Sequence, residues 1–357
     1  MSEGSALHNL PTRFSLGLIE CFDPLIRNAH LQTILARFWP VDIDDHLFPT
    51  ETRLFQTEPG VQVLAHCHYQ DGRHATSGSP GTMLIVHGLT GSSSSHYVVR
   101  LAARALQAGF DVIRLNIRNC GGTEHLTPTL YHSGLTVDLR LVTEQLRDSS
   151  LFIAGFSIGA NILLKLAGEW GRNAPSHVRA ICAISAPIDL AVSARRLRER
   201  QNRFYEDRFL RDLRKTIQRK QALMPERYSL APFSHIHSMI DFDDAYTAPC
   251  FGFRDAMDYY EQCSSKRLLP LIQVPTLILQ AQDDPFIPFE MFDDPAFREN
   301  AFLYLSAPRH GGHVGFLSLK NPRIWDTEQT MKFCQFYSAG QTVQWISPRP
   351  IGGSLVS

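Results

Sequence analysis

A serine near the middle of the chain stands in a setting that could make it a nucleophile. Residues 155–159 read Gly-x-Ser-x-Gly, with Ser157 at the centre. An apolar run at 151–154 precedes the motif, and a helix-forming segment at 160–170 follows it. A strand, a tight turn and a helix in this order are typical of a nucleophile elbow, which exposes the serine hydroxyl above a sheet. Glycine is expected on both sides because a side chain there would collide with a neighbouring strand or helix.

A serine nucleophile also needs a carboxylate that orients its base, and this acid follows the serine in the chain. The apolar run at 275–281 leads to Asp283 and Asp284. Both lie at the C-terminal end of a predicted strand, the layer from which an acid can reach the elbow. Asp284 is the preferred acid because a proline, Pro288, follows it four residues later. Asp283 stays open as the alternative.

The general base is expected after the next strand. That strand is predicted at 301–305, and His313 follows it, behind Gly311 and Gly312. The two glycines let the backbone loop over the sheet edge and aim the imidazole at the serine. A neutral imidazole can accept the serine proton and return it to a leaving group. His310, the competing histidine, is interpreted as a loop residue.

Two backbone N–H groups are expected to bind the negative oxygen that forms during acyl transfer. One belongs to Ile158, directly after the serine. The other follows the strand predicted at 82–86, where the His-Gly sequence at 87–88 leads to Leu89. The Leu89 N–H is expected to turn inward.

The surrounding elements alternate between strands and helices, which favours an α/β fold with a mostly parallel central sheet covered by helices on both faces. The expected strands lie at 51–55, 61–68, 82–86, 112–116, 151–154, 180–185, 275–281 and 301–305, and helices are expected at 93–106, 135–147 and 160–170.

The stretch 187–271 interrupts this alternation with charged, partly helical and aromatic-rich sequence, and we expect it to form a helical cap over the site. Packing of its aromatic residues against the sheet is the favoured role at these spacings, and shaping an acyl pocket is the alternative. These aromatics are Phe204, Tyr205, Phe233, Phe242, Tyr246, Phe251, Tyr259 and Tyr260. The core is predicted at 46–186 and 272–338, with an N-terminal arm at 1–45 and a C-terminal tail at 339–357.

Composition argues against several other classes of protein. Lys and Arg together number 35, as do Asp and Glu, so electrostatics favours neither nucleic acid nor an anionic membrane as the main partner. Seven scattered cysteines without a Cys-x-x-Cys pair favour reduced thiols and a cytoplasmic location. The first residues do not resemble a signal sequence or a membrane anchor. Neither His66-x-His68 nor His235-x-His237 has a third ligand nearby in sequence, so no metal site is expected.

Several further motifs carry a resemblance to a known family. Together with the serine, acid and histidine motifs, they make the chain resemble the YheT-like group of α/β-hydrolases, over roughly residues 20–335. The resemblance implies a serine hydrolase of carboxylic esters with short- to medium-chain or lipid-like acyl groups, and no metal or organic cofactor. The matching segments are residues 27–33, 87–91, 119–123, 131–134, 155–161, 283–285 and 311–313.

Other polar residues in and beside these segments are interpreted as structural. Arg118, Asn119, Tyr131 and His132 are expected to staple a long loop, with a role near the site as the alternative. Arg27, Asn28 and His30 are expected to pin the N-terminal arm onto the core. The sequence therefore predicts a small-molecule ester hydrolase with Ser157, Asp284 and His313 as its triad. A thioesterase, peptidase or perhydrolase on the same fold, or a non-catalytic binding protein, stay open as alternatives. Oligomeric state is left open.

Overall fold

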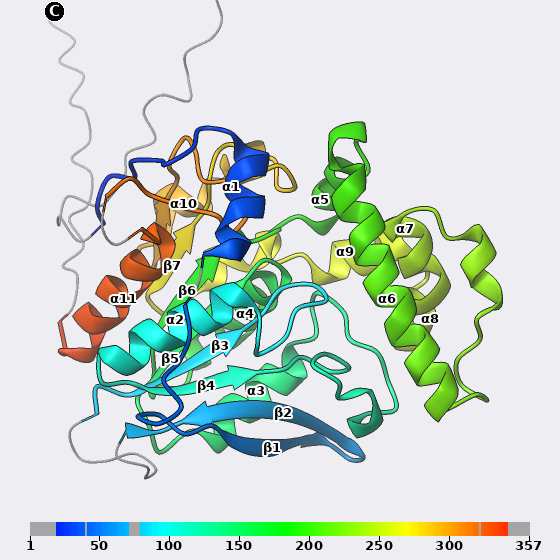
Figure 1. Ribbon diagram of the computed structural model, residues 1–357, viewed down its shortest axis with the longest axis horizontal. Helices are drawn as coiled ribbons and strands as arrows, with labels where there is room; N and C mark the ends of the chain where they lie inside the picture. The colour runs from blue at the N-terminus through cyan, green and yellow to red at the C-terminus, as the bar shows by residue number, and fades with distance from the viewer. Residues whose placement is uncertain (1–18, 40, 71–78, 321–322, 342–357) are drawn as a thin grey trace, which may run out of the picture.

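The computed structural model describes residues 19–39, 41–70, 79–320 and 323–341. Its centre is an eight-stranded sheet in the order β1-β2-β4-β3-β5-β6-β7-β8 (Figure 1). β2 pairs antiparallel with both β1 and β4, and all other pairs are parallel. The strands are β1 (Glu51–Glu58), β2 (Val61–His68), β3 (Thr82–Val86), β4 (Asp111–Leu115), β5 (Leu151–Phe156), β6 (Val178–Ile184), β7 (Thr276–Leu279) and β8 (Leu303–Ser306).

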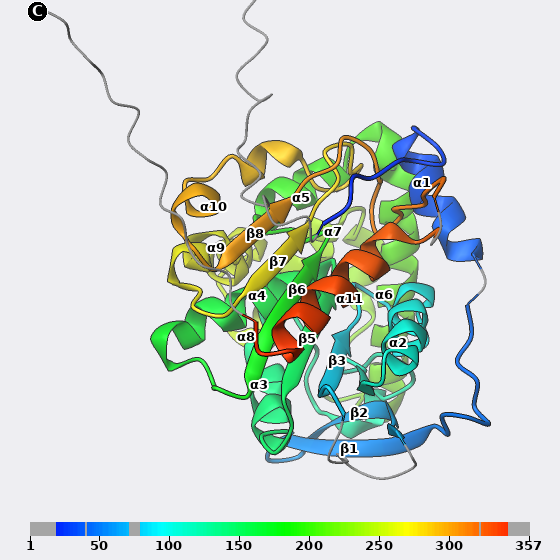
Figure 2. The same ribbon diagram turned by 90° about the vertical axis from the view of Figure 1, so that its left-hand side faces the viewer.

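Helices cover both faces of the sheet because its central strands are apolar on both sides. Leu84 and Ile153 belong to the core on one face, and Met83 and Phe152 to the core on the other. This alternation follows from the two-residue period of a strand. The first core includes α3 (Thr136–Gln145) and α4 (Ile158–Trp170), and the second includes α2 (His96–Gln107) and α11 (Trp325–Ser338). Figure 2 shows α11 lying across the sheet, with α2 beside it.

This arrangement confirms the predicted mostly parallel sheet with helices on both faces. The differences are α11, which is not among the expected helices, and the positions of element ends. α4 begins at Ile158, directly after the elbow serine, rather than at residue 160. β1 runs on to Glu58 and β8 begins at Leu303. Such shifts are expected because the ends of elements depend on local hydrogen bonds that hydrophobic patterns do not report.

The segment between β6 and β7 is helical and stands at the right of Figure 1. It carries residues that face Ser157 across a cavity. A division into a cap at 187–271 and a core at 46–186 and 272–338 stays a prediction. The helices of the segment are α5 (Leu190–Leu197), α6 (Arg203–Leu223), α7 (Met239–Phe242), a π-helical turn η8 (Asp243–Thr247), α8 (Ala248–Phe251), α9 (Ala256–Cys263) and a 3-10 helix η9 (Lys266–Leu271).

The N-terminal arm contains α1 (Ala29–Leu35) and the short 3-10 helix η2 (Ala36–Phe38). Residues 1–18 of the predicted arm and 342–357 of the predicted tail lie outside the described residues. In the part of the chain that the structure describes, no helix combines the length and the apolar character needed to cross a bilayer.

Candidate active site

Ser157 occupies a strained turn between β5 and α4. Its φ of 53° and ψ of −121° lie in a region that side-chain-bearing residues seldom adopt. The Ser157 N–H donates to the Ile184 carbonyl at 2.9 Å, which ties the turn to β6. A Cβ at Gly155 would lie 2.6 Å from the Gly159 oxygen, and one at Gly159 would lie 2.4 Å from the His87 oxygen. Both glycines are therefore required by close backbone packing, as the sequence predicted.

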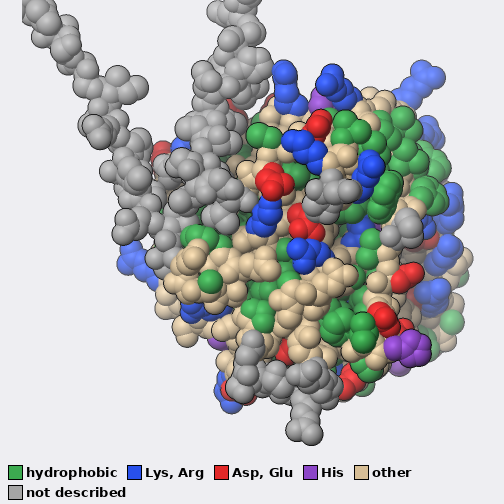
Figure 3. All heavy atoms as spheres, turned by 60° about the vertical axis from the view of Figure 1, so that its left-hand side comes forward, with side chains coloured by type: hydrophobic (Ala, Val, Ile, Leu, Met, Phe, Trp, Pro, Cys, Tyr) green, Lys and Arg blue, Asp and Glu red, His purple; other side chains and the backbone are tan. Residues whose placement is uncertain are grey.

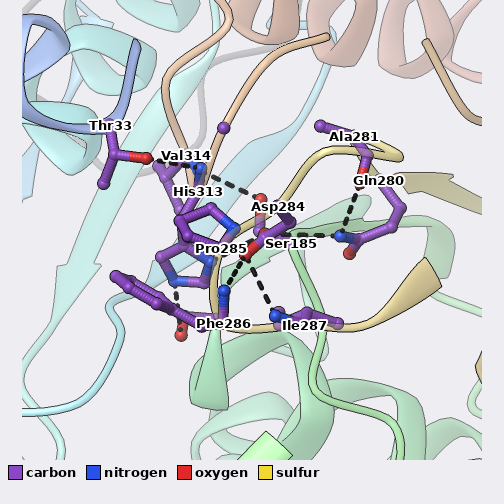
Figure 4. Close-up of polar contacts among 12 residues, drawn as sticks. Thr33, Ser185, Gln280, Ala281, Asp284, Pro285, Phe286, Ile287, His313 and Val314 are labelled. Atoms are coloured by element: carbon purple, nitrogen blue, oxygen red, sulfur yellow. Dashed lines mark hydrogen bonds and ion pairs between the residues drawn. The ribbon is translucent and has the colours of Figure 1, made fainter. Parts of the chain in front are cut away.

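His313 lies between Ser157 and Asp284 and contacts both. Its Nε2 is 3.0 Å from Ser157 Oγ, and its Nδ1 is 2.9 Å from Asp284 Oδ2 (Figure 4). The side chain of His313 is 11% exposed and that of Asp284 is fully buried. In the neutral imidazole, Nδ1–H donates to the carboxylate, so the Nε2 lone pair faces the serine hydroxyl. The three residues that the sequence singled out are thus brought into one hydrogen-bonded series.

The Asp284 carboxylate is held in place by its own loop. Oδ1 accepts hydrogen bonds from the backbone N–H groups of Phe286 and Ile287, at 2.9 and 3.1 Å. Oδ2 accepts one from Gln280 Nε2 at 3.3 Å. The Phe286 ring packs against the His313 imidazole, with centroids 4.6 Å apart. These contacts leave Oδ2 facing His313 and limit rotation of the acid.

The two alternative residues form a pair of their own. Asp283 Oδ2 lies 3.2 Å from His310 Nδ1, and Asp283 Oδ1 accepts a hydrogen bond from the Gly312 N–H at 2.9 Å. Burial raises the pKa of the Asp283 carboxyl. The pair braces the loop that carries His313, and neither of its members is hydrogen-bonded to Ser157.

The two predicted oxyanion donors, Leu89 and Ile158, both line the cavity beside Ser157. Within the described residues, neither N–H donates a hydrogen bond to the protein. The N–H groups of the two neighbouring residues, Gly88 and Thr90, are instead hydrogen-bonded to tyrosine hydroxyls. The Gly88 N–H donates to the Tyr97 hydroxyl at 3.0 Å, and the Thr90 N–H to the Tyr131 hydroxyl at 3.2 Å.

His87 braces the same loop from beneath. Its Nε2 accepts a hydrogen bond from the Ile117 N–H at 3.1 Å, so its proton is on Nδ1, which donates to the Gly88 carbonyl at 2.7 Å. Burial lowers the pKa of His87 to about 4, so the ring is neutral near pH 7. Sequence reasoning did not find this role, because neither hydrogen bond is visible in the motif alone.

Strained backbone gathers around these residues. Among the described residues, six that are not glycine have a positive φ, and four of them flank the site: Thr90, Ser157, Ser185 and Val314. The Ser185 hydroxyl accepts a hydrogen bond from the Val314 N–H at 3.1 Å, directly after His313. Strain of this kind persists only where surrounding contacts impose it, and it is common at functional sites.

A mainly apolar cavity leads from Ser157 into the helical segment, with about 990 Å³ of empty space including the part open to solvent. Three of the eight aromatics proposed for an acyl pocket line it, and Phe209 and Phe286 line it as well. Phe204 and Tyr205 lie at a second groove that opens on the same serine. The lining contributed by the helical segment includes Leu190, Ala194, Leu197, Leu213, Ile217, Met239, Phe242, Tyr259 and Tyr260.

Two polar side chains also line this cavity and are deeply buried. Asp243 accepts hydrogen bonds from the hydroxyls of Thr247 and Tyr260, both at 2.6 Å, and burial raises its pKa to about 6. Burial lowers the pKa of His132 to about 3, so this ring is neutral near pH 7. Within the described residues, no three His, Cys, Asp or Glu side chains are grouped as metal ligands.

The N-terminal arm reaches the site, which sequence reasoning did not anticipate. The backbone N–H of His313 donates to Thr33 Oγ1 at 2.9 Å. Gln32 donates to the Leu317 carbonyl at 3.0 Å and accepts from the Leu317 N–H at 2.8 Å. The arm is thus hydrogen-bonded to the histidine loop at His313 and at Leu317. No local sequence signal points to contacts between segments so far apart in the chain.

The residues interpreted as staples do connect separate elements. Arg118 pairs with Asp138 on α3, at 2.6 Å, and with Glu58 at the end of β1. Asn119 Nδ2 donates to the Thr129 carbonyl at 2.9 Å within the long loop. His30 Nδ1 lies 3.2 Å from the Tyr205 hydroxyl, which joins the arm to α6.

Comparison with known proteins places this fold and site in a class. Residues 81–318 match the family described as the α/β-hydrolase fold. Escherichia coli YheT, which carries a provisional esterase name, is 31% identical over 84% of this chain and 87% of its own length. The chain therefore belongs to the α/β-hydrolase family and, within it, to the YheT-like group, as its motifs predicted.

Two other relatives and one solved structure extend the comparison. A Saccharomyces cerevisiae monoacylglycerol lipase is 28% identical, over 74% of this chain and 61% of its own length. Human phospholipase ABHD3 is 27% identical, over 80% of this chain and 71% of its own length. The Pyrococcus furiosus esterase Pf2001 has a TM-score of 0.53 at 16% identity, covering 84% of this chain and 99% of the esterase. The structural likeness confirms the α/β-hydrolase fold, and the relatives' names support a hydrolase.

Proposed function

We propose that this protein is a serine hydrolase of carboxylic esters, with Ser157 as nucleophile, His313 as general base and acid, and Asp284 as the orienting acid. The observation that carries the proposal is the hydrogen-bonded series from Ser157 Oγ through His313 to the buried Asp284 carboxylate. It opens on a mainly apolar cavity. A nucleophile, a base oriented by an acid, and free N–H donors are the parts that acyl transfer requires.

In the first half-reaction, Ser157 Oγ attacks the ester carbonyl carbon while its proton passes to His313 Nε2. Asp284 stabilises the resulting imidazolium through Nδ1–H. The carbonyl oxygen becomes an oxyanion, which we assign to the N–H groups of Leu89 and Ile158. The tetrahedral intermediate then collapses, the carbon–oxygen bond to the alcohol breaks, and His313 gives its proton to the departing alcohol.

The second half-reaction repeats these steps with water. His313 takes a proton from a water molecule, which attacks the acyl-serine carbonyl, and the second tetrahedral intermediate expels Ser157 Oγ. His313 returns the proton to the serine, and the carboxylic acid is released. The residues named above supply every proton transfer, so the scheme calls for no cofactor.

We further propose short- to medium-chain or lipid-like acyl groups as the substrate class. Support comes from the leucine, isoleucine, methionine and phenylalanine side chains that line the cavity. An acyl chain placed there removes apolar surface from water, worth roughly 25 cal/mol per Å². The printed names of relatives, among them a monoacylglycerol lipase and a phospholipase, agree with such substrates.

Labelling by a fluorophosphonate probe tests the proposed nucleophile. The wild-type chain should be labelled and Ser157→Ala should not, whereas Ser234→Ala, at an exposed serine of the helical segment, should be labelled like the wild type. Equal labelling of Ser157→Ala and wild type would exclude the proposed nucleophile. Nitrophenyl esters of increasing acyl length, beside a matched amide and thioester, then rank the reactions, with esters expected first.

We also propose a cytoplasmic location. All seven cysteines are free, and five of them are buried. Cys182 and Cys334 have their sulfur atoms 3.9 Å apart, in a thiol hydrogen bond and not a disulfide. Free thiols at this density favour a reducing compartment.

A further inference from the structure

The N-terminal arm presents an apolar helical stripe to solvent. Leu31, Ile34, Leu35 and Phe38 follow the spacing i, i+3, i+4, i+7 over α1 and η2, which in most helices faces a core. Here all four side chains are exposed, with exposed fractions from 39% for Ile34 and Leu35 to 70% for Phe38. Phe204 at the start of α6 is 68% exposed, and its neighbour Tyr205 contacts His30 of α1.

The stripe is exposed because the opposite side of the helix is held to the core by polar groups. Gln32 is fully buried and hydrogen-bonds to Ile26 and Leu317, while Thr33 accepts the His313 N–H. The helix therefore has the reverse of the usual polarity, with an amide inside and leucine, isoleucine and phenylalanine outside. Rotating the helix to bury the stripe would break all of these hydrogen bonds.

The exposed stripe adjoins the opening of the catalytic groove. Ile34, Phe38 and Phe204 line a groove whose other side includes Ser157 and His313. Figure 3 shows hydrophobic side chains gathered at the upper right of the molecule, with Lys and Arg side chains around them. A large exposed apolar patch beside a site usually marks a surface that meets another apolar phase or molecule.

Two arginines give the patch its electrostatic character. Arg37 of η2 and Arg208 of α6 line the same groove, and burial together with the nearby Arg37 charge lowers the pKa of Arg208. Within the described residues, neither forms an ion pair, although the Asp212 carboxylate, which pairs with Lys215, is close enough to raise the pKa of Arg208. Neighbouring guanidinium groups without a carboxylate partner are suited to bind phosphate oxygens.

We propose that this face, formed by the stripe of α1 and η2 with Phe204, Arg37 and Arg208, docks on a phospholipid surface that carries anionic headgroups. The apolar side chains enter the interfacial region and the arginines contact headgroup phosphates, as in amphipathic helices that lie in the plane of a membrane. The combination of apolar stripe and unpaired cations favours this occupant over a second copy of the chain, which would bring like charges together. Docking goes beyond the proposed function, because binding to a surface requires no hydrolysis.

Sedimentation with vesicles tests the proposal, using Ser157→Ala as the background so that lipid is not consumed. Vesicles of phosphatidylcholine alone are compared with vesicles of equal parts phosphatidylcholine and phosphatidylglycerol. We expect binding to the mixed vesicles that weakens with added salt. Adding Ile34→Ser with Phe38→Ser should reduce the bound-to-free ratio at least tenfold. Adding Arg37→Gln with Arg208→Gln should remove the preference for the anionic vesicles.

Matched controls distinguish binding through this face from nonspecific adsorption to vesicles. Leu47 is 70% exposed, like Phe38, but lies outside the stripe, and Arg179 is an exposed arginine on β6. Leu47→Ser and Arg179→Gln should bind like the background chain, and thermal unfolding checks that every variant is folded. The proposal is overturned if the chain does not bind the mixed vesicles. It is also overturned if the stripe variants lower the molecular mass measured by light scattering while vesicle binding stays unchanged, because the stripe would then join two copies of the chain. Failure of fluorophosphonate labelling would instead count against the proposed function alone.

Discussion

Replacing Asp284 by asparagine should abolish most activity while keeping the shape of the site. In the wild type, Oδ1 accepts two backbone N–H groups, from Phe286 and Ile287, and Oδ2 faces His313 Nδ1 at 2.9 Å. The asparagine oxygen will keep the place of Oδ1, because the reverse orientation would point an NH₂ group at two buried N–H donors. Reversal would leave both buried N–H groups unpaired, at about 3 kcal/mol each, so the reversed fraction would be on the order of 10⁻⁴.

The favoured orientation places an amide donor against His313 Nδ1. The imidazole must then carry its proton on Nε2, which points at the Ser157 hydroxyl and can no longer accept the serine proton. The expected loss in kcat is about 10⁴-fold, equivalent to about 5.4 kcal/mol in the activation free energy. The favoured orientation loses the hydrogen bond that Gln280 donates to Oδ2. That bond is long, at 3.3 Å, so its loss does not reverse the preference for this orientation.

The assay is steady-state hydrolysis of a nitrophenyl ester, with thermal unfolding as the check on folding. Asp283→Asn is the matched control, since it changes the neighbouring acid and its contact with His310. We expect this control to lose less than about tenfold in kcat, because the indirect effect of a loop contact is of the order of one hydrogen bond. An Asp284→Asn enzyme that keeps more than about a hundredth of wild-type kcat, or an equal loss in both variants, would refute the reasoning.

Three further changes test other parts of the site. Gly159→Ala places a Cβ 2.4 Å from the His87 oxygen and 2.8 Å from the Val86 oxygen, so we expect a lower melting temperature and loss of activity together. Gly122→Ala has open space around its Cβ but a φ of +84°, so it should lose only the roughly 1–2 kcal/mol of a strained backbone and keep its activity. Tyr131→Phe removes the acceptor of the Thr90 N–H, so the neighbouring Leu89 N–H should be held less firmly and kcat should fall about tenfold. Tyr246→Phe removes a hydroxyl bonded to Ser229 and should leave kcat little changed. The pKa of His132 falls from 6.5 to about 3 on folding, so its contribution to stability is complete above pH 6.5 and is lost as the pH falls towards 3. The test is urea unfolding of wild type and His132→Gln between pH 4 and 6. The unfolding free energy of the variant should change less steeply with pH than that of wild type, by up to about 1.4 kcal/mol per pH unit. An unchanged slope would contradict the buried neutral ring.

Sequence reasoning could propose that the serine, the acid and the histidine lie together because each follows a short apolar strand of a parallel sheet. The C-terminal ends of such strands meet at one edge, so residues there are brought together whatever their separation in the chain. The choice between Asp283 and Asp284 could not be made so firmly. Side chains of adjacent residues at a strand end point in different directions, and the sequence does not say which one faces the histidine. Here the N–H groups of Phe286 and Ile287 hold the Asp284 carboxylate in that orientation.

The features of the site that could not be predicted from the sequence depend on tertiary packing. Only Phe242, Tyr259 and Tyr260 of the eight proposed aromatics line the cavity, because the side of each helix that faces it is set by neighbouring helices. The roles of Tyr97 and Tyr131 beside Leu89 arise from single hydroxyl groups that reach across loops. Neither role has a hydrophobic period or a motif spacing that would predict it.

The bonds from Gln32 and Thr33 to the histidine loop also bear on the order in which activity can develop during synthesis. Residues 32 and 33 leave the ribosome nearly three hundred residues before His313 and Leu317, to which they bond. Contacts of such long sequence separation form late, because the entropy of closing the loop must first be overcome. A nascent chain that has already built the serine elbow therefore has the residues that will anchor the base, but not yet the base itself. The proposed chemistry becomes available only when the first and last thirds of the chain meet, so the growing polypeptide passes through synthesis without an assembled nucleophile.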